Sequence, residues 1–256
     1  MHSLLISEKL RWITSTERNR SEAFYPSLAR RLIHSDQNFQ DLFTSDHMQI
    51  NEDIFLKDIL PLYEKEIASR ENYIFEKDLL KEKYLTRMRE GRKYFLFGFY
   101  DKSDSNLIGG YFYSIPTDTI SLAMRFFDRS VNKDTKSQVT IDFWAEWIFY
   151  DFVKSQGHKK YSLGVDHYPN IDRAGLPLYK LKVGSLPYET SSEQINIDVK
   201  SLSYQKQLVF FSNPNSNGQM STMNCISRTQ QPGGIVDELE KVTDWAGILF
   251  NKEYED

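Results

Sequence analysis

The chain has 256 residues, of which 40% are hydrophobic and 27% charged, as is typical of one folded domain with or without appendages. Its 17 Phe, 15 Tyr and 4 Trp exclude disorder over the full length, and its net charge of −4 excludes a generally basic surface for nucleic acid. A single cysteine, Cys225, excludes an internal disulfide, and no stretch approaches the ~20 apolar residues of a membrane span or the core of a signal peptide, so we expect a cytoplasmic protein.

The amino end has little periodicity. Residues 3–6 are apolar and could form an opening strand, whereas residues 7–50 follow no clean period and are locally basic. We interpret them as a solvated, partly helical surface rather than a phosphate- or RNA-binding patch. Residues 1–50 are therefore predicted to be an N-terminal extension.

Two helices are predicted next. Asn51 is a suitable N-cap, and apolar residues then recur at helical spacing as far as Ile67. Pro61 is expected to kink this helix or split it. A second helix over residues 77–89 is expected to stop at Gly91.

From about residue 93 the spacing of apolar residues changes from the helical period to a period of two. Residues 93–100, 107–115 and 119–127 are predicted to be three strands of an antiparallel meander, and their apolar and aromatic content suits a sheet covered on both faces. A helix over residues 139–153, a strand over 160–164, a loop over 165–173 and a short helix over 176–183 follow. Residues 195–199 and 208–211 are predicted to be late strands.

The carboxyl end divides into two parts. Residues 212–234 are rich in Ser, Asn, Gln and Gly and are predicted to be a polar linker, and residues 235–256 are predicted to be an amphipathic helix. The apolar face of that helix comprises Ile235, Leu239, Val242, Ala246 and Leu249. We expect it to dock on the same chain rather than on a second subunit, because intramolecular docking has the higher effective concentration.

Four stretches carry a resemblance to a known family. They are FLKDILPLYEKEIASR at residues 55–70, LIGGYF at 107–112, the helix–Gly–strand passage at 147–164 and GLPLYKLKVG at 175–184. Their order resembles the GNAT acyltransferase superfamily, and most closely its FemAB-like, aminoacyltransferase-related branch. The resemblance covers residues 51–188. It implies an α/β (α+β) fold with a mixed, mainly antiparallel central sheet flanked by helices over residues 51–211, to which the C-terminal helix would be an appendage.

The resemblance also implies an activity. Such a fold would transfer an acyl group from acyl-CoA to an amine or amino-acid acceptor by direct attack. An aminoacyl-tRNA or an acyl carrier protein is the alternative donor, and a non-catalytic binding module is the alternative to an enzyme. In this fold two neighbouring parallel strands splay apart, here residues 119–127 and 160–164, and a backbone N–H near the end of the first polarises the donor carbonyl.

The donor's pyrophosphate would lie at the start of the helix near Val139. Lys133, Lys136, Ser137 and Gln138 are the residues available to hold it. The family's glycine loop is missing, since residues 129–139 (RSVNKDTKSQV) contain no glycine. A charged, solvated loop is therefore the competing interpretation.

Three residues are candidates for proton transfer. Asp166 and His167 follow the strand 160–164, and loops beyond the carboxyl ends of strands are where open sheets bind ligands. His167 beside Asp166 is the first candidate for a general base, and a solvated histidine beside turn-capping carboxylates is the alternative. The resemblance offers Tyr179 as a general acid. Its distance from Gly184 is one residue longer than the family spacing, and core packing is the alternative.

Further side chains are candidates for substrate binding. Arg125 interrupts an apolar strand, so it is expected to meet either a substrate anion or a structural carboxylate, Asp142 or Glu146. Tyr111 and Tyr113 alternate on one strand face and would line the acceptor site or pack in the core. Tyr168 and Asp172 lie in the loop after the strand 160–164. No His, Asp or Glu set has the spacing of a metal site.

Overall fold

The protein is described here from a computed structural model. It covers residues 3–7, 9–68, 77–133, 137–168, 170–171, 174–190, 194–198, 207–227 and 234–254. The chain divides into two compact units. Unit 2 comprises residues 19–21 and 26–161, and unit 1 comprises residues 1–18, 22–25 and 162–256. None of the helices within these ranges is long and apolar enough to cross a membrane.

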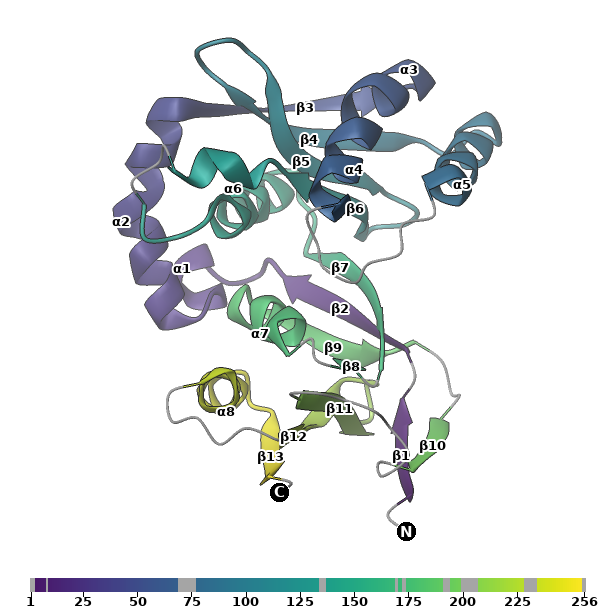
Figure 1. Cartoon of the computed structure of the whole chain (residues 1–256), viewed down its shortest axis with the longest axis vertical. Helices are drawn as coiled ribbons and strands as arrows, with labels where there is room; N and C mark the ends of the chain where they lie inside the picture. Colours follow the sequence, from purple (N-terminus) through teal and green to yellow (C-terminus); the bar gives the residue numbers. More distant parts are fainter. Residues whose placement is uncertain are drawn as a thin grey trace. The chain divides into compact units, whose positions relative to one another are not determined.

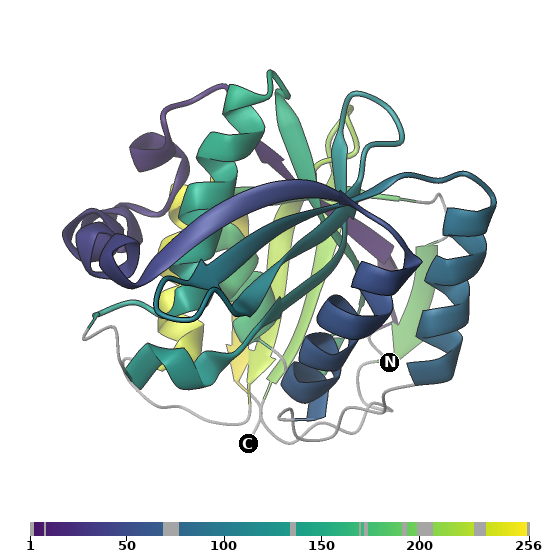
Figure 2. The ribbon, with the colours of Figure 1, turned by 90° about the horizontal axis from the view of Figure 1, so that it is seen from above.

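Unit 2 contains the predicted meander, with helices on both faces of its strands (Figures 1 and 2). Its strands pair antiparallel in the order β3-β4-β5-β6. The elements are α2 (Pro26–Leu42), β3 (Phe43–Ile50), α3 (Glu52–Ile54), the π-helix η1 (Phe55–Ile59), α4 (Leu60–Ala68), α5 (Lys77–Arg89), β4 (Tyr94–Asp101), β5 (Leu107–Ser114), β6 (Ile120–Phe127), the 3₁₀ helix η2 (Arg129–Lys133) and α6 (Ile141–Ser155).

The period-two pattern decides which side chains meet which helices. Tyr94 and Phe112 point to the core formed with α3, α4 and α5, where their rings stack with centroids 4.7 Å apart. Phe97 and Tyr111 point to the opposite face, where both rings lie within 6 Å of the ring of Phe149 on α6. The three predicted strands and the predicted cover on both faces are therefore confirmed.

The first predicted helix is interrupted where Pro61 stands. The Asn51 side chain accepts a hydrogen bond from the N–H of Ile54 at 2.9 Å, so the predicted N-cap is confirmed. The N–H of Leu60 donates to the carbonyl of Phe55, which makes residues 55–59 a π-helical turn. A proline ring clashes with the preceding turn of an ideal α-helix, and the wider turn removes that clash without ending the helix.

Unit 1 contains β1 (Ser3–Ser7), β2 (Lys9–Ser15), most of β7 (Lys160–His167), β8 (Asn170–Ile171), α7 (Gly175–Lys182), β9 (Ser185–Glu189), β10 (Gln194–Asp198), β11 (Gln207–Pro214), β12 (Met220–Ser227), α8 (Ile235–Trp245) and β13 (Leu249–Tyr254). The short helix α1 (Arg20–Ala23) has residues in both units. The larger sheet has seven strands: β3 to β6 of unit 2, β7, and then β2 and β9. A smaller sheet has the order β13-β12-β11-β8, and β1 pairs with β10.

The carboxyl end corrects the predicted architecture. There is no C-terminal helical appendage: α8 ends at Trp245, and β13 then pairs parallel with β12. Residues 220–227, within the expected polar linker, form β12, which pairs with β11. The Ser, Asn and Thr residues of β12 make this segment look like a polar loop in the sequence. Its few apolar side chains are enough for a strand here, because the neighbouring strand supplies the hydrogen bonds.

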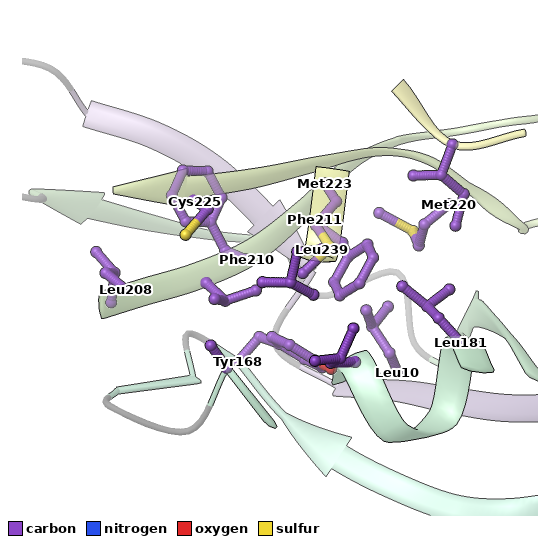
Figure 3. Packing of buried hydrophobic residues seen from close by; sticks show 14 of the residues in the cluster. Leu10, Tyr168, Leu181, Leu208, Phe210, Phe211, Met220, Met223, Cys225 and Leu239 are labelled. Carbon is purple, nitrogen blue, oxygen red and sulfur yellow. The ribbon is translucent and has the colours of Figure 1, made fainter. Parts of the chain in front are cut away.

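The predicted docking of α8 on its own chain is confirmed. Leu239 and Val242 are fully buried in a core with Phe211, Met223 and Leu181 (Figure 3). Leu249 differs from the prediction, since it lies on β13 and is 64% exposed. The same core takes Leu10 and Trp12 from β2, within the segment expected to be a solvated surface.

Gly184 joins α7 to β9 where the chain passes very close to Ala23. A Cβ atom at Gly184 would lie 2.2 Å from the carbonyl oxygen of Ala23, and the backbone φ of Gly184 is +78°. Nearby, the N–H of Tyr25 donates to the carbonyl of Lys182 at 2.8 Å. A side chain at Gly184 would therefore separate this segment from the end of α7.

We predict that Gly184→Ala lowers thermal stability more than Gly157→Ala. Gly157 also has φ +78°, but a Cβ there would meet nothing within 4 Å, so its substitution adds only the left-handed penalty of about 1–2 kcal/mol. Calorimetric or circular-dichroism melting curves of the two variants measure the difference. Equal losses would show that the contact with Ala23 adds nothing.

Candidate functional site

In unit 2, charged side chains gather where β6 ends and α6 begins. Arg125 of β6 lies 3.9 Å from Asp142 of α6, and Arg129 of η2 lies 3.4 Å from both Asp142 and Glu66 of α4. We call these four residues the arginine–carboxylate cluster. The side chains of Glu66 and Asp142 are only 1% and 9% exposed, so their charges require the two guanidinium groups. Of the two roles predicted for Arg125, the structural ion pair with Asp142 is observed.

The cluster also occupies the end of β6. The N–H of Phe127, the last residue of that strand, donates to the carboxylate of Glu66 at 3.3 Å. A donor that faces a buried carboxylate is not available to a carbonyl oxygen of a substrate. Phe127 therefore does not supply the polarising N–H that the resemblance implies near this strand end.

The start of α6, where a donor pyrophosphate was predicted, carries a carboxylate of its own. Asp142 lies in its first turn, where its carboxylate meets the positive end of the helix dipole, and the N–H of Ile141 donates to the side chain of Asn132 at 2.7 Å. Ser137 accepts a hydrogen bond from the N–H of Val139 at 3.1 Å, and Gln138 is exposed. The side chain of Lys133 and the whole of Lys136 lie outside the described residues.

The two predicted tyrosines of β5 are in the core. The Tyr111 hydroxyl donates to Glu146 at 2.9 Å, and the Tyr161 hydroxyl donates to the other carboxylate oxygen of Glu146 at 2.6 Å. Tyr113 is 1% exposed and packs on the rings of Phe95 and Phe149, and its burial raises the pKa of its hydroxyl. Within unit 2 neither phenol is presented to solvent.

In unit 1, a second charged pair lies where β7 ends. The ammonium of Lys180 on α7 donates to the carboxylate of Asp166 at 2.8 Å, and it lies 5.4 Å from the centre of the Trp12 ring. The side chains of Lys180 and Asp166 are 6% and 13% exposed. The pair formed by Lys180 and Asp166 therefore lies beside the indole ring of Trp12. The predicted base residue Asp166 is thus held by a buried cation.

Of the remaining predicted residues of this unit, the structure describes the side chains of Tyr168 and Tyr179. Tyr168 is 2% exposed and meets the Phe211 ring edge-on at 5.2 Å, so it packs in the core (Figure 3). Tyr179 is half-buried on α7. The side chain of His167 and the whole of Asp172 lie outside the described residues, although the backbone of His167 ends β7.

Sequence reasoning missed Lys180, Glu66 and Arg129 as members of charged clusters. The run LPLYKLKV did carry a signal, because two lysines interrupt an apolar helix and both are buried. Lys182, the second of them, pairs with Glu238 of α8. Among the residues that the structure describes, no three His, Cys, Asp or Glu side chains are placed to hold a metal ion.

Comparison with known proteins gives a likeness of fold. No protein-family model and no curated protein sequence matches the chain. FemX superposes with a TM-score of 0.50 at 10% identity, over 70% of this chain and 59% of FemX. L-PGS from Bacillus licheniformis gives 0.41 at 11% identity, over 69% of this chain and 52% of that one, and a tandem GNAT protein from the clavulanic acid biosynthesis pathway gives 0.40 at 11%, over 73% and 52%.

The chain thus has the GNAT-type fold found in FemX, a mixed α/β fold with a mostly antiparallel seven-stranded sheet. The predicted resemblance in fold to the FemAB-like branch is confirmed. The chain spans less than two thirds of the length of FemX.

We predict that Lys180→Met destabilises the protein by roughly 3–5 kcal/mol, because it leaves the buried carboxylate of Asp166 without its cation. Lys182→Met is the matched control. Its partner Glu238 is 47% exposed and can be hydrated, so the expected loss is about 1 kcal/mol or less.

Urea denaturation of Lys180→Met, Asp166→Asn and the double variant Asp166→Asn/Lys180→Met measures the coupling in a double-mutant cycle. The double variant should recover part of the loss. A double variant as unstable as the sum of its two single changes would show that the pair is not coupled.

Cys225 is predicted to be unreactive in the folded protein. It is 1% exposed on β12, and burial raises the pKa of its thiol to about 11, so the thiol stays protonated through neutral pH. A disulfide reagent at pH 8 should modify it only in denaturant. Rapid modification of the native protein would contradict this placement.

Proposed function

We propose that this protein transfers an aminoacyl or acyl group to an amine by direct attack, with no covalent enzyme intermediate. The observation that carries the proposal is the fold shared with FemX, together with the motifs that resemble FemAB-like aminoacyltransferases. The attacking nitrogen loses a proton, a C–N bond forms, and the bond from the carbonyl carbon to the donor's oxygen or sulfur breaks. The departing group takes up a proton.

We infer that the donor does not place a pyrophosphate at α6. The glycine loop is absent, and the guanidinium groups of Arg125 and Arg129 beside the first turn of α6 are already paired with the buried carboxylates of Asp142 and Glu66. This pairing favours an aminoacyl ester, such as aminoacyl-tRNA, or a carrier-bound acyl group over acyl-CoA, the commonest donor of the superfamily.

His167 is proposed as the general base. It follows Asp166 at the carboxyl end of β7, the position at which open sheets present catalytic loops. Because Asp166 already bonds to Lys180, that pair fixes the strand end, and Asp166 serves as a positioning residue rather than as the base. Tyr179, on the same helix as Lys180, remains the candidate acid for the leaving group.

The proposal is tested with hydroxylamine as a surrogate amine, because hydroxamate formation reports acyl transfer whatever the natural acceptor is. Mixed aminoacyl-tRNA and acetyl-CoA are offered separately to the intact protein. We expect hydroxamate from the aminoacyl ester faster than without the protein, and release of CoA no faster than without it. His167→Ala should lower the rate about 10²–10⁴-fold with an unchanged melting temperature.

The matched control is His34→Ala, an exposed histidine of α2 that should leave the rate unchanged. Release of CoA with hydroxamate formation would return the donor to acyl-CoA. An unchanged rate in His167→Ala would move the base to another residue.

A second candidate function is a non-catalytic binding module. The contact between Glu66 and the N–H of Phe127 favours it, since that contact fills a position where a transferase of this fold would polarise its substrate. The same assay separates the two: with a binding module, neither donor forms hydroxamate faster than in the absence of the protein.

A further inference from the structure

Unit 2 carries a basic surface that the proposed transfer activity does not use. Residues 77–93, which form α5 and the turn after it, contain seven Lys or Arg against three Asp or Glu, in a chain whose net charge is −4. Two of these cations have carboxylate partners: Lys77 pairs with Glu64, and Arg89 pairs with Glu52. Arg87, Arg92 and Lys93 form no ion pair with a carboxylate in the part of the chain that the structure describes.

The end of α5 brings two of these cations together. The N–H of Arg92 donates to the carbonyl of Arg87 and the N–H of Gly91 donates to that of Met88, both at 2.9 Å. This is the Schellman arrangement, which sets the second residue beyond the helix beside its last turn. That place usually holds an apolar contact, and here the two residues are Arg87 and Arg92.

A hollow of about 610 Å³ opens beside Arg92. It is lined by Glu90, Gly91, Arg92, Lys93, Phe95, Ser114, Ile115 and Pro116. The volume lies within the range of about 300–1,000 Å³ that is usual for ligand sites in proteins. Its wall is apolar at Phe95, Ile115 and Pro116, and Ile115 is 36% exposed. The hollow therefore joins an apolar wall to a cationic rim.

We propose that this hollow binds an acidic segment of a partner protein, with one bulky apolar side chain against Phe95, Ile115 and Pro116 and carboxylates on Arg92 and Lys93. The cationic rim favours an acidic partner by charge complementarity, and the apolar wall favours a bulky apolar side chain of that partner. The proposal goes beyond the transfer activity and does not depend on it.

The ring contacts of Phe95 argue against a nucleic acid as the occupant. A single strand binds by stacking its bases on open aromatic faces. The Phe95 ring already stacks with His47 at 5.6 Å and with Tyr113 at 5.7 Å, at interplanar angles of 27° and 26°. Its remaining edge suits a side chain rather than a base.

The test uses a short capped peptide rich in glutamate, with one central leucine and a fluorescent label, and measures its anisotropy with the intact chain. We expect saturable binding at about 50 mM salt that weakens as the salt is raised, because the contacts are ionic. Arg92→Glu/Lys93→Glu should weaken binding at least about tenfold. It should also bind the matching peptide in which lysine replaces glutamate.

Arg30→Glu/Arg31→Glu is the matched control, since it reverses two adjacent cations of α2 and changes the net charge equally. Equal loss in this control would overturn the proposal, as would absence of saturable peptide binding. Tighter binding of a single-stranded RNA of similar length and charge would also overturn it. Replacing the central leucine by serine should weaken binding, and no change would overturn the apolar part of the site.

Discussion

The carboxylate of Glu146 is the group on which the organisation of unit 2 most depends. It is fully buried in the middle of α6 and accepts one hydrogen bond from Tyr111 and one from Tyr161. A buried carboxylate is tolerated only with such donors, so the helix cannot move away from either tyrosine without a large electrostatic cost. Because Tyr161 is the second residue of β7, the same carboxylate fixes where that strand begins. Asp166 and His167 follow at its other end.

The buried carboxylates set the charge balance at the start of α6. The start of a helix is a natural anion site because its first N–H groups lack partners within the helix. Asp142 occupies that position from within the chain, and Glu66 lies close to it on the same guanidinium of Arg129. The positive end of the helix thus already faces a carboxylate of the chain itself.

Periodicity predicted those parts of the fold in which each strand has its own apolar pattern. β4, β5, β6 and α6 were predicted from sequence alone because each carries its own run of apolar and aromatic residues, which are largely buried in the structure. β3 was not predicted, since its middle residues are exposed and polar, with an edge-strand pattern. β12 and β13 were missed for a related reason: their stability comes from neighbours far along the chain, which local pattern does not reveal.

The charged residues of the candidate site could also be predicted only in part. An arginine within an apolar strand requires an acid, and Asp142 was one of the two named, because a strand and the helix after it are neighbours in sequence and in space. Glu66 precedes Phe127 by 61 residues, and no spacing rule connects them.

The two lysines of α7 differ in their surroundings, and only the structure reveals the difference. Both are buried on one short helix, but Lys180 meets a nearly buried carboxylate under an indole, whereas Lys182 meets a half-exposed one. Burial of the partner, and not of the lysine itself, decides which of the two charges is fixed in place.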